Sequence, residues 1–155
     1  MKRRTMLGAA LLLPALTARA HHGWSSFDQE RPIYLEGRVT SVRWQNPHAE
    51  LDLELAPGLR LPADLASRVL PPQSSQVDGK ALLARAQLPT RKDRTWEIEL
   101  APLTRMEAWK VAPIRPGASV SLLGFTLKGE VGEAVLRVEY LFLDGKVYAL
   151  RSSPA

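Results

Sequence analysis

The chain has 155 residues and no cysteine. The absence of cysteine excludes disulfide bonds, thiolate metal ligands and a cysteine nucleophile. Methionine is also scarce, because Met1 and Met6 belong to the first twenty residues and Met106 is the only other one. A soft Cu(I) site made of thiol or thioether ligands therefore cannot form.

A surplus of positive charge is absent once the first twenty residues are set aside. The formal net charge is +5, but four of the 21 basic residues lie in that segment, which leaves 17 basic against 16 acidic residues. A nearly neutral chain offers little electrostatic attraction to a phosphate backbone. We therefore expect no nucleic-acid partner.

The sequence lacks an apolar run long enough to span a bilayer. Residues 1–20 combine a basic head, the short apolar stretch "MLGAALLLPAL" and the small-residue ending "ARA", which is typical of a cleaved export signal. We expect cleavage after Ala20, a periplasmic or secreted protein, and no stable membrane span after cleavage. A retained anchor is the alternative. Arg3-Arg4 also resembles a twin-arginine signal, so the export route is left open.

Alternating apolar and polar residues dominate the rest of the chain. In the clearest case, residues 51, 53 and 55 are leucines and residues 50, 52 and 54 are acidic. Residues 102–110 have helical spacing after Pro102, and Gly37 is a candidate bulge. Strands are predicted at 33–44, 49–56, 95–100, 115–127, 134–143 and 146–150.

A short helix after the third of five or six strands indicates a mainly β fold, a small OB-like antiparallel barrel. A β-sandwich is the alternative. Residues 21–155 are expected to form a single domain, with a partly helical insertion at about 58–94 that includes helical pieces in 62–70 and 81–88. The insertion has too few apolar residues for a core of its own.

The chain contains three histidines, His21, His22 and His48. Cleavage after Ala20 would free the α-amine of His21, so that an amine nitrogen and an imidazole nitrogen of one residue could chelate a metal ion. A second imidazole from His48, with His22 as competitor or neighbour, would complete a histidine brace. Planar nitrogen ligation suits Cu(II), with Zn(II) second. The alternative is that the histidines are structural or incidental.

Several residues near the histidines could support such a site. Asn46 before Pro47 favours a turn in front of His48. If the next strand begins at or before His48, this histidine shares a face with Glu50 and Asp52. Asp28 is a further carboxylate that could support the site. Two pairs of carboxylates, Glu50 with Asp52 and Glu97 with Glu99, are explained by alternation along the outer faces of strands without a catalytic site.

The segments "AHHGWSSFD" and "YLEGRVTSVRWQNPHAEL" resemble a family of small exported bacterial proteins known as a domain of unknown function. That family has an "AHH" start after the leader and an "NPH" turn. The resemblance implies that His21, His22, Asn46, Pro47 and His48 match its motifs, and it implies no activity. Shorter members lack the segment at 58–94.

Three functions follow from these features. The first is a periplasmic metal-binding protein that handles Cu(II) without catalysis, with a possible periplasmic protein partner. The second is a small β-barrel module that binds a protein or polymer through aromatic anchors, Trp24, Phe27, Trp44 and Trp109. The third is a brace-type copper oxygenase, which needs an open coordination position and usually an axial tyrosine. Because Tyr34, Tyr140 and Tyr148 fall within strand patterns, and no catalytic triad or phosphate loop is evident, we assign no catalytic residue.

Overall fold

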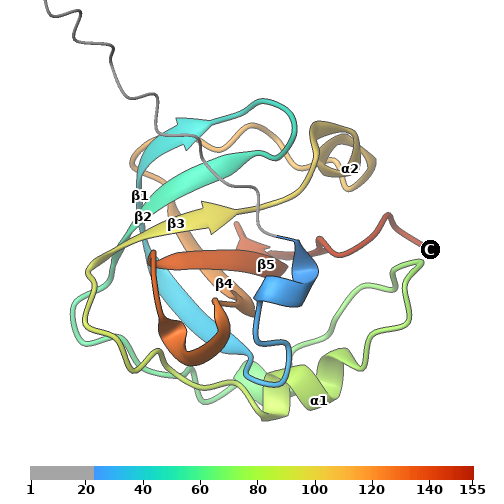
Figure 1. Cartoon of the computed structure of the whole chain (residues 1–155). Coiled ribbons are helices and arrows are strands. Elements are labelled where there is room, and N and C mark those ends of the chain that lie inside the picture. The colour runs from blue at the N-terminus through green and yellow to red at the C-terminus, as the bar shows by residue number, and fades with distance from the viewer. Residues whose placement is uncertain (1–22) are drawn as a thin grey trace, which may run out of the picture.

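The computed structural model describes residues 23–155, which form a mainly β structure (Figure 1). The strands are β1 (Ile33–Arg43), β2 (Glu50–Leu55), β3 (Thr95–Glu99), β4 (Ser119–Phe125), β5 (Val135–Leu143) and β6 (Lys146–Ala149). The α-helices are α1 (Gly79–Ala84) and α2 (Leu103–Ala108), and three 3₁₀ turns are η1 (Trp24–Ser26), η2 (Leu65–Ser67) and η3 (Lys128–Glu130). The predicted strands and the predicted helix after Pro102 are therefore present.

The strands close into a barrel. Neighbouring strands follow the order β3-β2-β1-β4-β5, and β3 pairs back onto β5, so that five strands form a ring to which β6 adds at β5. With α2 between β3 and β4, this confirms the OB-like barrel and not the sandwich. The expectation of a wholly antiparallel barrel is wrong for the β3–β5 pair, which is parallel. The chain passes through α2 and β4 between these two strands, and such a crossover permits parallel pairing.

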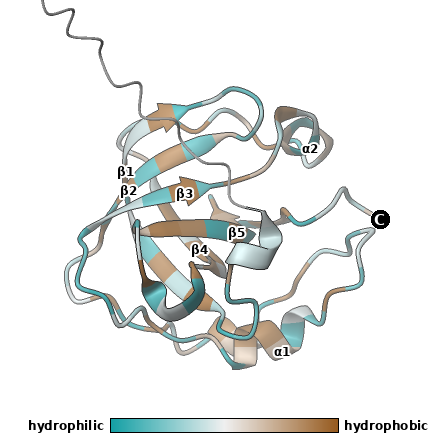
Figure 2. Ribbon diagram, in the orientation of Figure 1, coloured by the Kyte–Doolittle hydropathy of each residue, from teal (hydrophilic) through white to brown (hydrophobic). Residues whose placement is uncertain are grey.

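Alternation along the strands fills the barrel interior, as the banded colouring of the strands in Figure 2 illustrates. Leu51 and Leu53 of β2 and Trp96 and Ile98 of β3 are completely buried there. Met106 of α2 is also buried in this core, so the helix closes one end of the barrel. A closed interior of this kind holds without disulfide bonds.

The predicted bulge at Gly37 is wrong. The register of β1 against β2 shifts between Val39 and Ser41, whereas Gly37 pairs regularly with Leu55. A Cβ atom at Gly37 would lie 2.0 Å from the carbonyl oxygen of Glu54. Glycine is required here because the backbones of two strands approach closely, and not because the strand bends.

The insertion forms a second core outside the barrel. The predicted helical pieces are present as η2 and α1, and the Asp78 carboxylate caps α1 by accepting the Ala81 N–H at 2.9 Å. Leucines from these two elements pack on outward-facing aromatic residues of β1, β4 and β5. This cluster includes Leu65, Leu82, Leu83, Tyr34, Phe125, Tyr140 and Phe142. The segment thus covers one outer face of the barrel and is not a separate domain. Within residues 23–155, no helix has the length and apolar character of a membrane span.

Candidate functional site

A row of four charged residues crosses the outer face of the barrel. Arg43 on β1 is opposite Glu50 on β2, which is opposite Glu99 on β3, which is opposite Arg137 on β5. The Arg43 Nε donates to Glu50 Oε2 at 2.8 Å, and the Arg137 Nε donates to Glu99 Oε2 at 2.8 Å. Glu50 is 9% exposed and Glu99 is 4% exposed, so both carboxylates are buried although they point away from the barrel interior.

A second row lies beside the first. Asp52 is opposite Glu97, and it accepts hydrogen bonds from the Ser41 hydroxyl and, at 3.3 Å, from Arg43 Nη1. We define the carboxylate face as the six charged residues of these rows, Arg43, Glu50, Asp52, Glu97, Glu99 and Arg137. Four carboxylates and two guanidinium groups give it a formal charge of −2. Like charges directly opposite each other on neighbouring strands are destabilising. Arg43 and Arg137 offset this repulsion between Glu50 and Glu99.

His48 lies at the edge of the carboxylate face. β2 begins at Glu50, but Ala49 extends its pairing, because the Ala49 N–H donates to Ala101 O and the Leu100 N–H donates to Ala49 O, both at 2.9 Å. Ala49 is fully buried and points inward. Alternation then places the half-buried His48 on the same outer side as Glu50.

The predicted turn before His48 is present between β1 and β2. The Asn46–Pro47 peptide bond is cis. The Asn46 Oδ1 accepts the N–H of Leu103 at 3.3 Å, which ties this turn to the start of α2. Asn46 and Pro47 therefore fix the position of the backbone that carries His48.

The first described residues lie on the outer face of β5, where η1 crosses it in Figure 1. The indole of Trp24 lies over two guanidinium groups, with Arg137 Cζ 5.1 Å and Arg151 Cζ 4.2 Å from its centroid. Phe27 is 1% exposed and its backbone bridges to Leu127. The N-terminal segment is thereby attached beside the carboxylate face.

Asp28 lies apart from the other carboxylates predicted to support the site. Its N–H donates to Thr126 O at 2.9 Å, beside the end of β4, and its Oδ1 accepts the Glu30 N–H at 3.2 Å. Glu50 and Asp52 do lie on one face with His48, but Arg43 binds both of them. The structure therefore gives these two carboxylates a partner other than a metal.

The described residues do not form a complete metal site by themselves. Within residues 23–155, no group of three histidine, aspartate or glutamate side chains is placed to hold a metal ion. His21 and His22, which the prediction needs, lie outside the described residues. The histidine brace accordingly stays a prediction.

Sequence reasoning missed the buried charges of β5. Glu139 is completely buried, with Arg151 Nε at 2.7 Å and Gln73 Nε2 at 3.2 Å. Burial raises the pKa of the Glu139 carboxyl above 4.5, although Arg151 and Gln73 oppose the shift. Charged residues at positions 137 and 139 of an otherwise apolar strand were the available signal, because buried charges need partners.

The aromatic residues predicted to anchor a partner contact the protein itself. Phe27 is buried, and Trp24, Trp44 and Trp109 are half-buried against the two cores. The Trp109 indole N–H donates to Ser152 O at 2.8 Å. Much of the surface of these four aromatic residues is therefore covered by the protein itself.

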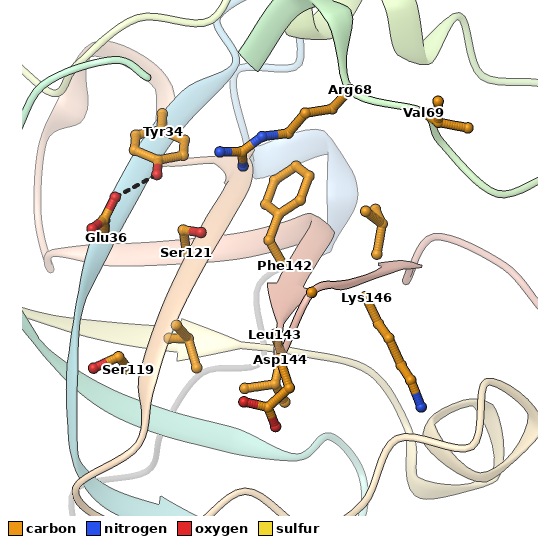
Figure 3. Close-up of a pocket in the computed structure, with 13 residues that line it drawn as sticks. Tyr34, Glu36, Arg68, Val69, Ser119, Ser121, Phe142, Leu143, Asp144 and Lys146 are labelled. Atoms are coloured by element: carbon orange, nitrogen blue, oxygen red, sulfur yellow. Dashed lines mark hydrogen bonds between the residues drawn. The ribbon is translucent and has the colours of Figure 1, made fainter. Parts of the chain in front are cut away.

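An open groove of about 650 Å³ lies elsewhere on the outer face, over β1, β4 and the β5–β6 hairpin (Figure 3). Tyr34 is buried and donates from its hydroxyl to Glu36 at 2.6 Å; burial and this hydrogen bond raise the pKa of Tyr34 to about 12. The Arg68 guanidinium stacks over Phe142 at 4.7 Å. Among residues 23–155, neither His48 nor any other predicted site residue lines this groove.

The comparisons with known proteins bear on the first third of the chain. Residues 10–58 match the model of a family of unknown function, DUF6152. No curated protein and no solved structure matched the chain. The matched segment includes β1 and β2 and every residue predicted for the metal site, and it ends at Gly58, where the insertion begins. It thus fits a domain whose function is not yet assigned.

Proposed function

We propose that this chain is an exported metal-binding protein that holds Cu(II) between the processed N-terminus at His21 and the imidazole of His48. The ligands would be the α-amine and imidazole of His21 and one nitrogen of His48. His22 lies next to the chelating residue and is the competing ligand. The proposed role is copper handling without catalysis.

One observation supports the proposal above all. Trp24 contacts side chains on the outer face of β5, and His48 lies on the outer face of the barrel at the start of β2. Only β3 lies between β5 and β2, so these two strands are about 10 Å apart. Three residues of chain reach at most about 11 Å. The reach of this segment and the spacing of the two strands are similar, which supports the approach of a processed N-terminus at His21 to His48.

The composition of the carboxylate face supports Cu(II) over Zn(II). Arg43 binds Glu50 and Asp52, which disfavours oxygen ligation and leaves nitrogen donors as the main ligands. Imidazole and amine nitrogens in a planar arrangement suit Cu(II). The formal charge of −2 on the carboxylate face would attract a divalent cation.

The test compares the chain that begins at His21 with the same chain acetylated at its α-amine. Both are titrated with Cu(II) by calorimetry against a competing chelator. We expect the chain with the free amine to bind at least about tenfold more tightly, because acetylation turns the His21 amine into an amide. Equal affinities would exclude the amine of His21 as a ligand.

A second candidate function, binding of a protein or polymer, is favoured by the groove in Figure 3 and not by the predicted aromatic anchors. Val69 lines this groove and is 87% exposed, so its side chain is accessible to a partner. Arg68→Ala and Val69→Asp would weaken capture of a partner there without changing Cu(II) affinity. Loss of Cu(II) binding with both substitutions would argue that the groove and the metal site are one.

A further inference from the structure

Trp24 is held by two arginines whose positions are themselves fixed by buried glutamates. Arg137 binds Glu99, which is 4% exposed, and Arg151 binds Glu139, which is completely buried. Both guanidinium groups lie within 6 Å of the Trp24 ring centroid, the range of a cation–π interaction.

Two phenylalanines fix the orientation of the same indole. The rings of Phe27 and Phe125 meet Trp24 edge-on, with centroids 6.4 Å and 6.3 Å away. Phe27 and Phe125 are each 1% exposed, so they belong to the rigid part of the fold. The two arginines therefore hold the indole by cation–π contacts, and the two phenylalanines hold it by edge-on packing.

This arrangement exceeds what is needed to bury a tryptophan. Trp24 is only partly buried, and apolar burial alone does not explain why two arginines held by buried glutamates converge on it. Its position does decide where the preceding residues of the chain can go, because Gly23 is exposed and contributes no side chain of its own.

We propose that Trp24 is the positioning residue of the copper site, and that its indole, held by Arg137 and Arg151, keeps the processed N-terminus within reach of His48. This inference rests on the proposed function, since it assigns a role to a residue next to the proposed ligands. Trp24 itself provides no ligand.

The test uses Trp24→Phe and Trp24→Leu, each in the chain that begins at His21 and in the same chain acetylated at its α-amine. Tryptophan binds cations best, phenylalanine less well, and leucine lacks a π face. In the chain with the free amine we expect Cu(II) affinity to fall about threefold with Trp24→Phe and about tenfold with Trp24→Leu. Neither substitution should change the weaker affinity of the acetylated chain. Trp109→Leu, at the half-buried tryptophan that caps the C-terminus of α2, is the matched control and should leave Cu(II) affinity unchanged.

The outcomes separate this inference from the proposed function. If the unsubstituted chain that begins at His21 binds no more tightly with a free α-amine than with an acetylated one, the proposed function fails. If it binds more tightly but both Trp24 substitutions leave affinity unchanged, only the positioning role is overturned. Electron paramagnetic resonance of the Cu(II) complex gives a second readout, because Trp24→Leu should reduce the number of coordinating nitrogens and Trp24→Phe should retain it. Should Trp24→Leu fail to fold, as urea unfolding would show, an affinity for Trp24→Phe equal to the unsubstituted chain overturns the role.

Discussion

Glu50 and Glu99 face each other directly across the antiparallel β2–β3 pair, and each carboxylate has an arginine on its other side. Two adjacent buried carboxylates would repel each other, so the flanking cations of Arg43 and Arg137 make this register possible. The row thus links β1, β2, β3 and β5, four of the five strands of the ring. It also contacts the first described residues, because Trp24 stacks on Arg137.

Removing one member of the buried ion pair should be costly. In Arg137→Met, Glu99 would remain buried beside Glu50 without a counter-charge. We expect the free energy of unfolding in urea to fall by about 3–5 kcal/mol. The double variant Glu99→Leu/Arg137→Met removes both charges and should recover most of that loss. A double variant as unstable as Arg137→Met would contradict this explanation.

The buried Glu139 carboxyl should make stability depend on pH in a defined direction. Burial raises its pKa in the folded protein above the ordinary 4.5, although Arg151 and Gln73 oppose the shift. Such a group stabilises the fold below the unfolded pKa, and the contribution is lost as pH rises through the folded pKa. We therefore expect the unfolding free energy of the unsubstituted chain, relative to Glu139→Gln, to fall as pH rises from about 4.5. A relative stability that rises with pH would indicate a lowered pKa instead.

Gly37 should not tolerate a methyl group. A Cβ atom would collide with the Glu54 carbonyl of β2, so Gly37→Ala must separate two paired strands. We expect a loss of about 3 kcal/mol or more in urea unfolding. Gly23→Ala is the matched control: its nearest new contact is the Ser25 hydroxyl at 3.8 Å, and its effect should stay within about 0.5 kcal/mol. Similar unfolding free energies for the two variants would show that β1 and β2 can move apart at little cost in free energy.

Copper binding should weaken as pH falls. The α-amine of a processed His21 has an ordinary pKa of about 8, and the metal must displace its proton. Between pH 8 and about 6.5 we expect affinity to fall about tenfold per pH unit, and more steeply below that as imidazoles also become protonated. Calorimetric titrations at four pH values would measure this slope. A flat profile above pH 6.5 would mean that no amine ligand is used.

The sequence predicted the strands well because one face of each strand is buried. Strict alternation at residues 50–55 and the helical spacing after Pro102 both reflect the closed barrel core. The parallel β3–β5 contact was missed, because barrel closure joins segments that no local pattern relates. The role of residues 58–94 was missed for a similar reason: their leucines pack on the outside of distant strands.

The charged residues show the limit of pattern reasoning at the site. Alternation correctly placed Glu50 and Glu99 outside the barrel, but it could not show that both are buried there. That burial depends on Arg43, which comes from the preceding strand, and on Arg137, which lies 38 residues after Glu99. Likewise, the spacing from His21 to His48 in the sequence gives no distance in space, and only the structure shows that Trp24 lies on the outer face of β5.

In the proposed site, the nitrogen ligands of one metal ion come from His21 and His48. Pulsed electron paramagnetic resonance of the Cu(II)-loaded chain beginning at His21 tests this ligand set by counting the imidazoles coupled to the metal. We expect two coupled imidazoles in the unsubstituted chain and in His22→Ala. In His48→Ala we expect one, and the Cu(II) affinity of that variant should be reduced by more than about 100-fold. An unchanged spectrum and affinity in His48→Ala would contradict it.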